Sequence, residues 1–422
     1  MEFHNLNEEN SSTQALHVSK RKKKRQHVCI YGFLIAALIG IMIGLAVGIP
    51  LAKRDSPDQN VQEAQNVLKQ YPLIDGHNDL PWQYRQYVQN KVYEVNLRAD
   101  TRIQWTNTTN MTSYDFPRLP PQTDIPRLKQ GMVGAQFWAA FGPCSATGKD
   151  AIRIGILDAY LSRNRIASLI GLEGGHMISN TLGVLRSFYS LGVRYMTLTH
   201  SCDTSWAENW KQDLNRTGLR RGLSEFGKIV VKEMNRLGMI IDLAHVAKQT
   251  MIDAIKTSAA PVIFSHSSAF EKCEHYRNVQ NDVLEMVKNN TGLVMINFYD
   301  SYISKGCLPI NATESTMQHV IDHINYIKDF IGVDFVGIGA DYDGVPTLPV
   351  GLEDVSKYPD LFAKLREGGW STNDLKKLAG ENFIRVFKDV EKVKENQKTF
   401  QPYEDFLPEE EAVPNRMCYT SF

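Results

Sequence analysis

The stretch GMIIDLAHVAKQTMIDAIKTSAAPVIFSH (residues 238–266) decides the fold of this chain. It contains two short apolar runs, around residues 242 and 263, on either side of a helical pattern over Lys248–Thr257. Near-continuous apolar runs of this length are typical of strands that are buried on both faces, as in a parallel sheet. The stretch therefore predicts a strand–helix–strand unit, and each of its strands is followed by a histidine, His245 or His266.

Six further apolar runs extend this pattern along the chain. Amphipathic patterns over Phe226–Leu237 and Met317–Phe330 lie between some of the runs, and a helix over Asp374–Val393, capped by Ser371, follows the last one. Eight strands that alternate with helices predict an α/β fold, a (β/α)8 TIM-like barrel. The six further runs are PLIDGHNDL near residue 75, GAQFWAAF near 137, IASLIGLEGG near 170, RYMTLTH near 197, GLVMINF near 295 and DFVGIGADYDG near 338.

An uncharged stretch, Val28–Ala52, precedes the barrel and follows a basic run over Lys20–Arg25. Its length suits a membrane-spanning helix, since about 20 apolar residues cross a bilayer core. A cleaved signal peptide is the alternative, but its apolar and N-terminal regions are shorter than those found here. Because basic flanks stay cytoplasmic, we expect an uncleaved type II signal anchor in the cell membrane and an extracellular catalytic domain. The expected divisions are a cytoplasmic tail at 1–27, a transmembrane anchor at 28–52, a linker that becomes a short helix at 53–70, a barrel domain at 71–394 and a C-terminal arm at 395–422.

The overall composition excludes two broad classes of protein. The chain has 422 residues, 47 basic and 47 acidic, and 43% of its residues are hydrophobic, so most of it is not disordered. A net charge of zero also argues against a general nucleic-acid binder. Six cysteines are too few for a disulfide scaffold. Cys29 lies in the anchor, so five face an oxidising compartment and one is left for a partner chain or stays free.

Glycosylation sequons agree with an extracellular barrel. Five of them follow the anchor, although such triplets also arise by chance. A further sequon at Asn10 lies on the cytoplasmic side of the anchor, where we expect no glycan. The five are at Asn107, Asn110, Asn215, Asn289 and Asn311.

Polar residues end most of the apolar runs, and in a barrel these positions converge at the carboxyl ends of the strands, where active sites lie. His77 and Asp79 share one face of their strand, since side chains alternate with period two, so both can bind one ion. His245 and His266 can bind a second ion, with Glu173 as a bridge between the two. Imidazole and carboxylate ligands without a thiolate favour Zn²⁺, with Mn²⁺ and Co²⁺ as alternatives. His200 and Asp341 end two further runs.

Other polar residues have simpler interpretations. His176 is expected to be hydrogen-bonded in the core, because a lone buried histidine is more often structural than a ligand. His319 and His323 stand at helical spacing and are expected at the surface. Asp343 is a candidate for the site or for a turn.

At these residues the chain resembles the membrane (renal) dipeptidase family of zinc metallopeptidases. The resemblance covers about residues 73–392. It includes DGHNDLPW (75–82), ASLIGLEGGH (167–176), LTHSCDTSWAENW (198–210), RLGMIIDLAHV (236–246), APVIFSHSSA (260–269), RNV (277–279), DYDGVP (341–346) and GLEDVSKYPDL (351–361).

The resemblance implies a barrel of the metal-dependent hydrolase type with two zinc ions per subunit. His77 and Asp79 match the ligands of one ion, His245 and His266 those of the other, and Glu173 the bridging carboxylate. Asp341 matches the catalytic acid/base, which holds the bridging water. His200 matches a histidine that binds the substrate carbonyl and stabilises the oxyanion, and Arg277 matches the arginine that pairs with the substrate carboxylate.

The resemblance also implies substrates and covalent links. Members of the family cleave dipeptides, including cystinyl-bis-glycine and leukotriene D4, and some open β-lactam rings. Cys144 with Cys202 and Cys273 with Cys307 match intrachain disulfides. Cys418 matches a cysteine that joins two subunits into a homodimer.

Two departures from the family stand out. The sequence ends in RMCYTSF, without the hydrophobic tail that the family exchanges for a lipid anchor, and we expect the N-terminal segment to serve as the anchor instead. The segment between Cys144 and Ile166 is also shorter than the family's, which has a long helix there. Either ILDAYLSR (156–163) covers the barrel alone, or the sequence is a splice or gene-model variant with a damaged wall. The alternatives to a dipeptidase are another binuclear amidohydrolase and a non-catalytic cell-surface ectodomain.

Overall fold

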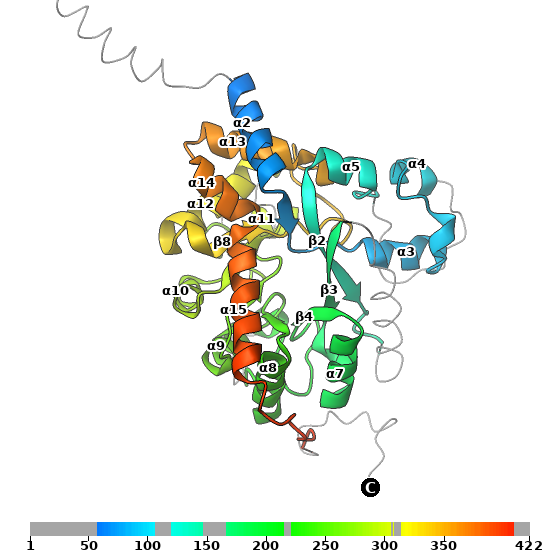
Figure 1. Cartoon of the computed structure of the whole chain (residues 1–422), viewed down its shortest axis with the longest axis vertical. Helices are drawn as coiled ribbons and strands as arrows, with labels where there is room; N and C mark the ends of the chain where they lie inside the picture. Colours follow the sequence, from blue (N-terminus) through cyan, green and yellow to red (C-terminus); the bar gives the residue numbers. More distant parts are fainter. Residues whose placement is uncertain are drawn as a thin grey trace, which may run out of the picture. The chain divides into compact units, whose positions relative to one another are not determined.

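A computed structural model describes residues 57–105, 120–146, 166–214, 221–304, 307 and 314–408. The barrel belongs to one compact unit that begins at Asn60 (Figure 1). The predicted anchor at 28–52 lies outside the described residues. Among the helices within them, none combines the length and the apolar content needed to cross a bilayer.

Eight parallel strands close into a barrel in chain order, which confirms the predicted fold (Figure 1). Each strand pairs with the next one, and β8 returns to β1 through Asp75 and Ile338. All eight predicted apolar runs contain a strand, although β6 has only two residues. The strands are β1 Leu73–Asp75, β2 Val133–Phe141, β3 Ala167–Glu173, β4 Val193–Thr197, β5 Ile240–Asp242, β6 Ile263–Phe264, β7 Leu293–Ile296 and β8 Val336–Ile338.

Helices connect most of these strands and agree closely with the predicted ones. The predictions for 226–237, 248–257 and 317–330 correspond to α8, α9 and α12. The α-helices described are α2 Pro57–Gln70, α3 Leu80–Val88, α4 Thr101–Trp105, α5 Ile125–Gln130, α7 Leu182–Ser190, α8 Glu225–Leu237, α9 Lys248–Thr257, α10 Asn281–Asn290, α11 Asp300–Ile303, α12 Met317–Ile331, α13 Tyr358–Glu367, α14 Thr372–Lys376 and α15 Asn382–Asn396. Short 3-10 turns occur at Val92–Glu94, Gly175–Ile178, Trp210–Leu214, Val333–Phe335 and Val355–Lys357.

The predicted helix over 374–393 differs in detail. Ser371 caps α14 as expected, through reciprocal hydrogen bonds with Asp374. A π-helical turn over Lys377–Glu381 then separates α14 from α15. The single helix predicted from the sequence does not contain this turn, which inserts about one extra residue into one turn of the helix.

Helix α2 occupies most of the segment expected to be a linker. Its Ala64, Val67 and Leu68 are buried in the main core. These residues recur at helical spacing, so one face of α2 packs against the barrel unit. The folded unit therefore begins within the predicted linker.

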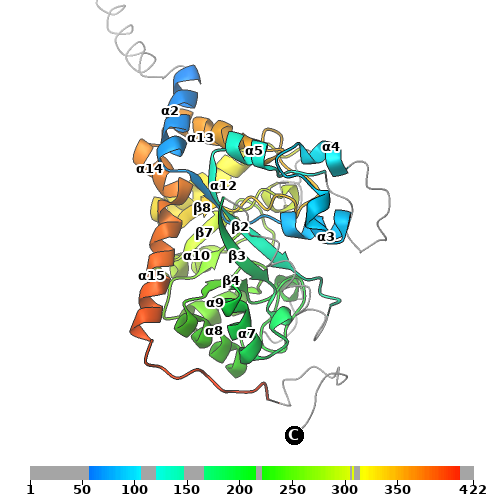
Figure 2. The same ribbon diagram turned by 45° about the vertical axis from the view of Figure 1, so that its right-hand side comes forward.

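One end of the barrel is closed by α15. Its Phe383, Val386 and Val390 pack against residues of the barrel interior, including Phe137 and Met295. Figure 2 shows α15 and α3, which follows β1, on opposite sides of the strands, so α3 lies toward the other end of the barrel. The carboxyl ends of the strands are thus left for a site, as is usual in this architecture.

The seam between β2 and β3 is continuous beside the short connection between them. Seven residue pairs, from Ala135↔Ala167 to Phe141↔Glu173, keep one register. The indole Nε1 of Trp138 donates a hydrogen bond of 2.9 Å to Ser168 Oγ across this seam. Residues 147–165 of the connection lie outside the described part of the chain.

Candidate active site

The carboxyl ends of five strands bring the predicted site residues together. His77 and Asp79 follow β1, and Glu173 is the last residue of β3. The remaining members lie two or three residues beyond their strands, and all are buried. They are His245 after β5, His266 after β6 and Asp341 after β8.

One oxygen of Glu173 lies at the centre of this group. Its Oε1 is 3.1 Å from Nε2 of His245, 3.4 Å from Nε2 of His77 and 3.5 Å from Nε2 of His266. The Nε2 atoms of His245 and His266 are 2.8 Å apart. His77 Nε2 also lies 3.2 Å from Asp79 Oδ2. The arrangement places three imidazoles and two carboxylates around one point.

The backbone is strained where it delivers two of these side chains. His245 and Asp341 both have φ of 70°, in the left-handed region that most residues avoid. Such strain persists only where the surrounding structure determines it, and it is concentrated at functional sites. At Gly344 an added Cβ would lie 2.1 Å from Asp79 Oδ2 and 2.5 Å from Asp341 Oδ1. Only glycine therefore lets this loop approach the two carboxylates.

Burial and neighbouring charges determine which side chains of the site are charged. It raises the pKa of Glu173 well above its usual range and that of Asp341 to about 7, because the charged forms lose solvation. It lowers the pKa values of His245 and His266 well below their usual range, so both imidazoles are neutral. Burial also opposes a charge on His77, but the nearby carboxylates of Glu173 and Asp79 outweigh it and raise its pKa to about 10.

This donor set fits divalent metal ions. The two neutral imidazoles, whose Nε2 atoms are 2.8 Å apart, can each offer a lone pair to a cation when the proton is on Nδ1. Several buried carboxylates need a compensating positive charge, which a metal ion supplies. Ligand atoms close enough to share an ion occur in three overlapping groups: His77 with Asp79 and Glu173, Glu173 with His200 and His245, and His77 with His266 and Asp341.

His200 lies at the edge of the group, on the loop after β4. Its Nε2 is 3.9 Å from Glu173 Oε1, and its ring centroid is 4.2 Å from that of His245. The predicted disulfide between Cys144 and Cys202 is present, and its Cys144 sulfur lies 3.9 Å from His200 Nδ1. The disulfide therefore anchors the loop that carries His200 to the end of β2.

Arg277 lies across the cavity from α3 and is only 2% exposed. Its guanidinium donates long hydrogen bonds of 3.4 Å to Ser267 Oγ and to the carbonyl of His266, and its Nε has no partner. Among the described residues, no carboxylate forms an ion pair with it. The Tyr302 ring centroid is 5.3 Å from its Cζ. A buried guanidinium that no carboxylate of the described residues contacts directly is suited to bind an anionic group of a ligand.

The loop that carries Arg277 is held by its neighbours. The predicted disulfide between Cys273 and Cys307 is present. The expectation that His323 lies at the surface is wrong, because it is buried on the inner face of α12. Its Nδ1 accepts a hydrogen bond from the Ala269 amide, and its Nε2 donates to the carbonyl of Ile303. His323 thus fastens the loop between β6 and α10 to α11.

Asn297, at the end of β7, orients Asp341. Its side-chain amide donates a hydrogen bond of 2.8 Å to Asp341 Oδ2, and its Oδ1 accepts one from the backbone amide of Tyr299. Because the Asn297 carboxamide is fixed at both ends, Asp341 keeps Oδ1 toward His77, at 3.8 Å from Nε2.

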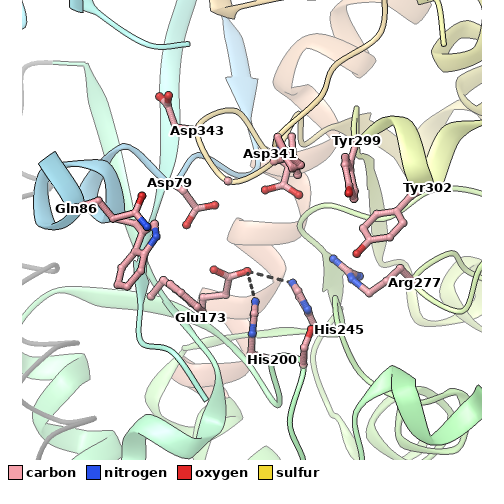
Figure 3. A pocket seen from close by; sticks show the side chains of 16 residues that line it. Asp79, Gln86, Glu173, His200, His245, Arg277, Tyr299, Tyr302, Asp341 and Asp343 are labelled. Carbon is pink, nitrogen blue, oxygen red and sulfur yellow. Dashed lines mark ion pairs between the residues drawn. The ribbon is translucent and has the colours of Figure 1, made fainter. Parts of the chain in front are cut away.

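The site opens into a cavity of about 290 Å³ (Figure 3). Glu173, His200, His245, Arg277, Asp341 and Asp79 all line it, and so do residues that the sequence did not single out. Most of these lie on α3 or on loops after strands, where no periodic pattern marks them. The additional lining residues include Trp82, Gln86, Phe141, Tyr299 and Tyr302.

The other candidate residues lie at the edge of the site or away from it. His176 is structural as expected, since its Nε2 donates to the carbonyl of Gly142. His319 accepts the Thr316 amide at the start of α12 and is half-buried. Asp343 lines the cavity, and burial raises its pKa to about 7. Asn289 is exposed on α10. The other predicted sequons and Cys418 lie outside the described residues: Asn107, Asn110, Asn215 and Asn311.

Comparison with known sequences identifies relatives. The chain matches the profile of the family described as membrane dipeptidase (Peptidase family M19) over residues 61–160 and 153–401. The two matched parts meet within the short connection between β2 and β3. The chain is 39% identical to Dipeptidase 3 of Rattus norvegicus over 371 residues, which cover 82% of this chain and 71% of the relative. Dipeptidase 3 of Mus musculus is also 39% identical, over 82% of this chain and 70% of the relative.

Solved structures share the fold. A metallo peptidase from Rhodobacter sphaeroides, solved with a phosphinate mimic of the dipeptide L-Ala-D-Ala, superposes with a TM-score of 0.63 at 23% identity. The match covers 76% of this chain and 99% of that one. The probable dipeptidase PvdM from Pseudomonas aeruginosa superposes with a TM-score of 0.62 at 18% identity, over 80% of this chain and all of the other.

Proposed function

Because the chain belongs to the membrane dipeptidase family (Peptidase family M19) and is a metal-dependent dipeptidase, we propose that it hydrolyses dipeptides with a free C-terminal carboxylate. The buried guanidinium of Arg277, which has no acidic partner among the described residues, carries this proposal. It offers a carboxylate two parallel hydrogen bonds at one end of a small cavity. A longer peptide would place its carboxylate elsewhere.

Two zinc ions per subunit are the metal content that we propose. His77 and Asp79 would hold one, His245 and His266 the other, and Glu173 would bridge them, in keeping with the contacts of Glu173 Oε1. When bound, the ions would lower the pKa of a water molecule, so that it can lose a proton at neutral pH, and would polarise the scissile carbonyl.

The chain's own residues then perform the remaining tasks. Arg277 binds the substrate carboxylate and so sets which bond lies beside Glu173. His200 hydrogen-bonds the carbonyl oxygen as negative charge develops on it. Asp341, held by Asn297, takes a proton from the attacking water and delivers it to the leaving amine.

Substrates of the family extend the proposal. We propose cystinyl-bis-glycine and leukotriene D4 as substrates of this chain. We also propose that its site hydrolyses the ring of β-lactams. The Rhodobacter sphaeroides structure holds a dipeptide mimic, which supports a dipeptide as the ligand of this fold.

A panel of dipeptides assayed with and without a chelator tests the function. The full-length protein should cleave dipeptides, lose this activity with chelator, and regain it when Zn²⁺ is added back, because its ligands bind the metal reversibly. C-terminally amidated dipeptides, an ester and a cyclic amide serve as the comparison substrates. Preferred cleavage of the ester or the cyclic amide would favour another binuclear amidohydrolase, and activity that persists after metal removal would contradict the proposal.

We also propose that the chain is a type II membrane protein and a homodimer linked through Cys418. The support is the charge pattern around 28–52 and the odd number of cysteines beyond it. Protease added to intact cells should therefore release a fragment that runs as a disulfide-linked dimer, and Cys418→Ser should give a monomer on the same non-reducing gel. Resistance of the intact chain would contradict the topology, and an unchanged dimer in the variant would assign the bridge to another cysteine.

A further inference from the structure

The cavity has two chemically different ends, and only one of them is explained by the proposed function. Arg277 lies at one end, next to the Tyr302 ring. At the other end α3 presents Trp82 and Gln86, four residues apart and therefore on one face of the helix. Figure 3 shows Gln86 and Arg277 on opposite sides, with Glu173 and His245 between them.

The two ends fix the direction in which a dipeptide lies. A dipeptide has one residue on each side of its scissile bond. If its carboxylate binds Arg277, and the bond lies beside Glu173 and His200, the side chain of its N-terminal residue points toward α3. The wall there is aromatic, since the rings of Trp82 and Phe141 meet edge to face at 4.9 Å. This wall suits the apolar stem of a side chain.

Gln86 is an uncharged polar side chain at this end, where Asp79 and Asp343 also line the cavity. Its side chain is largely buried, with 9% of its surface exposed, and its carboxamide has no hydrogen-bond partner among the described residues. A buried amide without a hydrogen-bond partner destabilises the protein. A ligand group that forms a hydrogen bond with it therefore gains binding free energy. Because a carboxamide is neutral, it cannot compensate a full charge brought into the cavity.

We propose that Gln86 determines specificity for the N-terminal residue of the substrate, favouring an uncharged side chain that reaches it along Trp82 and Phe141. This inference rests on the proposed dipeptidase function. It assigns Gln86 to substrate selection and gives it no part in the bond-breaking step. Gln-Gly and Met-Gly are therefore favoured over Lys-Gly and Glu-Gly.

Charge substitutions at Gln86 test the assignment on a ratio of substrates. In the full-length protein, Gln86→Glu should raise the kcat/KM ratio of Lys-Gly to Glu-Gly by roughly tenfold or more, and Gln86→Lys should lower it similarly, because opposite charges attract and like charges repel in a water-poor cavity. The ratio does not depend on how much protein folds. Gln89→Glu is the matched control, since Gln89 is exposed at the end of the same helix, and it should change the ratio less than about twofold.

Two results are decisive and distinct from each other. If wild-type protein cleaves dipeptides but both Gln86 variants keep its substrate ratio, the specificity assignment is overturned. If wild-type protein cleaves no dipeptide, the proposed function itself fails. Zinc content measured on each variant should remain that of the wild type, because Gln86 is not among the candidate ligands.

Discussion

Replacing Glu173 by Gln should remove at least one metal ion per chain and lower kcat/KM for dipeptides by about a thousandfold, or about 4 kcal/mol. Gln is neutral and has one oxygen, so it cannot carry negative charge between two cations and bind both. Three imidazole nitrogens contact the same carboxylate oxygen in the wild type, and they would lose their common anion. Elemental analysis for zinc and a dipeptide assay on the same preparation check both parts.

The alternative role for Glu173 is a hydrogen-bond acceptor at a strand end. In that role Glu173→Gln would destabilise the fold by about 1 kcal/mol and leave the chemistry intact, since Gln still accepts hydrogen bonds. Two zinc ions per chain and near-normal turnover in this variant would therefore overturn the bridging role and leave Glu173 with a structural one. Glu173→Asp keeps the charge but withdraws it by one methylene, so it should fall between the two.

Glu208 provides a control for this experiment. It is also a buried glutamate, but its Oε2 accepts hydrogen bonds from the backbone amides of Arg221 and Gly222, away from the cavity. A single Gln oxygen can accept both bonds. Glu208→Gln should accordingly retain metal and activity, so that any loss in Glu173→Gln is attributable to its position.

Replacing Arg277 by Lys should lower kcat/KM for dipeptides by roughly 10- to 100-fold, because charge-assisted hydrogen bonds each contribute about 1.5–3 kcal/mol. Lys keeps the charge but loses the planar fork that pairs with a carboxylate. For a C-terminally amidated dipeptide, which lacks that carboxylate, the same substitution should change kcat/KM by less than about twofold. Steady-state kinetics on each acid and amide pair give this comparison directly.

Equal losses on the acid and the amide would remove Arg277 from carboxylate binding and make it a structural residue. Arg236→Lys is a suitable control. Arg236 also forms charge-assisted bonds, partly buried, donating to both oxygens of Glu233 at 2.7 Å, but it lies on α8 and does not line the cavity. It should leave the ratio of acid to amide unchanged.

The barrel and most of the metal-ligand candidates were predictable because their signals are local. A strand buried on both faces is a nearly continuous apolar run, and β1 to β8 each fall in one. The His-x-Asp spacing predicted that His77 and Asp79 lie together, although both follow the last residue of β1 and do not share a face of it. Strand ends placed Glu173, His245 and His266 beside them. These inferences need only the chain direction and the closure of the sheet.

Features that depend on tertiary contact were not predictable in this way. Gln86 and Trp82 line the cavity because α3 turns back across the barrel mouth, and no pattern in the helix marks that face. His323 was assigned to the surface from its spacing alone, whereas its two ring nitrogens join segments far apart in the sequence. Asn297 shows the same limit, since its importance depends on where Asp341 lies.

The continuous seam between β2 and β3 has a consequence for how the site moves. The ladder of seven pairs ends at Phe141↔Glu173, and the disulfide from Cys144, three residues beyond Phe141, reaches Cys202, two residues beyond His200. A displacement of the end of β2 would therefore carry Glu173 and the His200 loop with it. The two groups behave as one mechanical piece, so strain at this edge of the barrel changes their common position before it changes the distance between them.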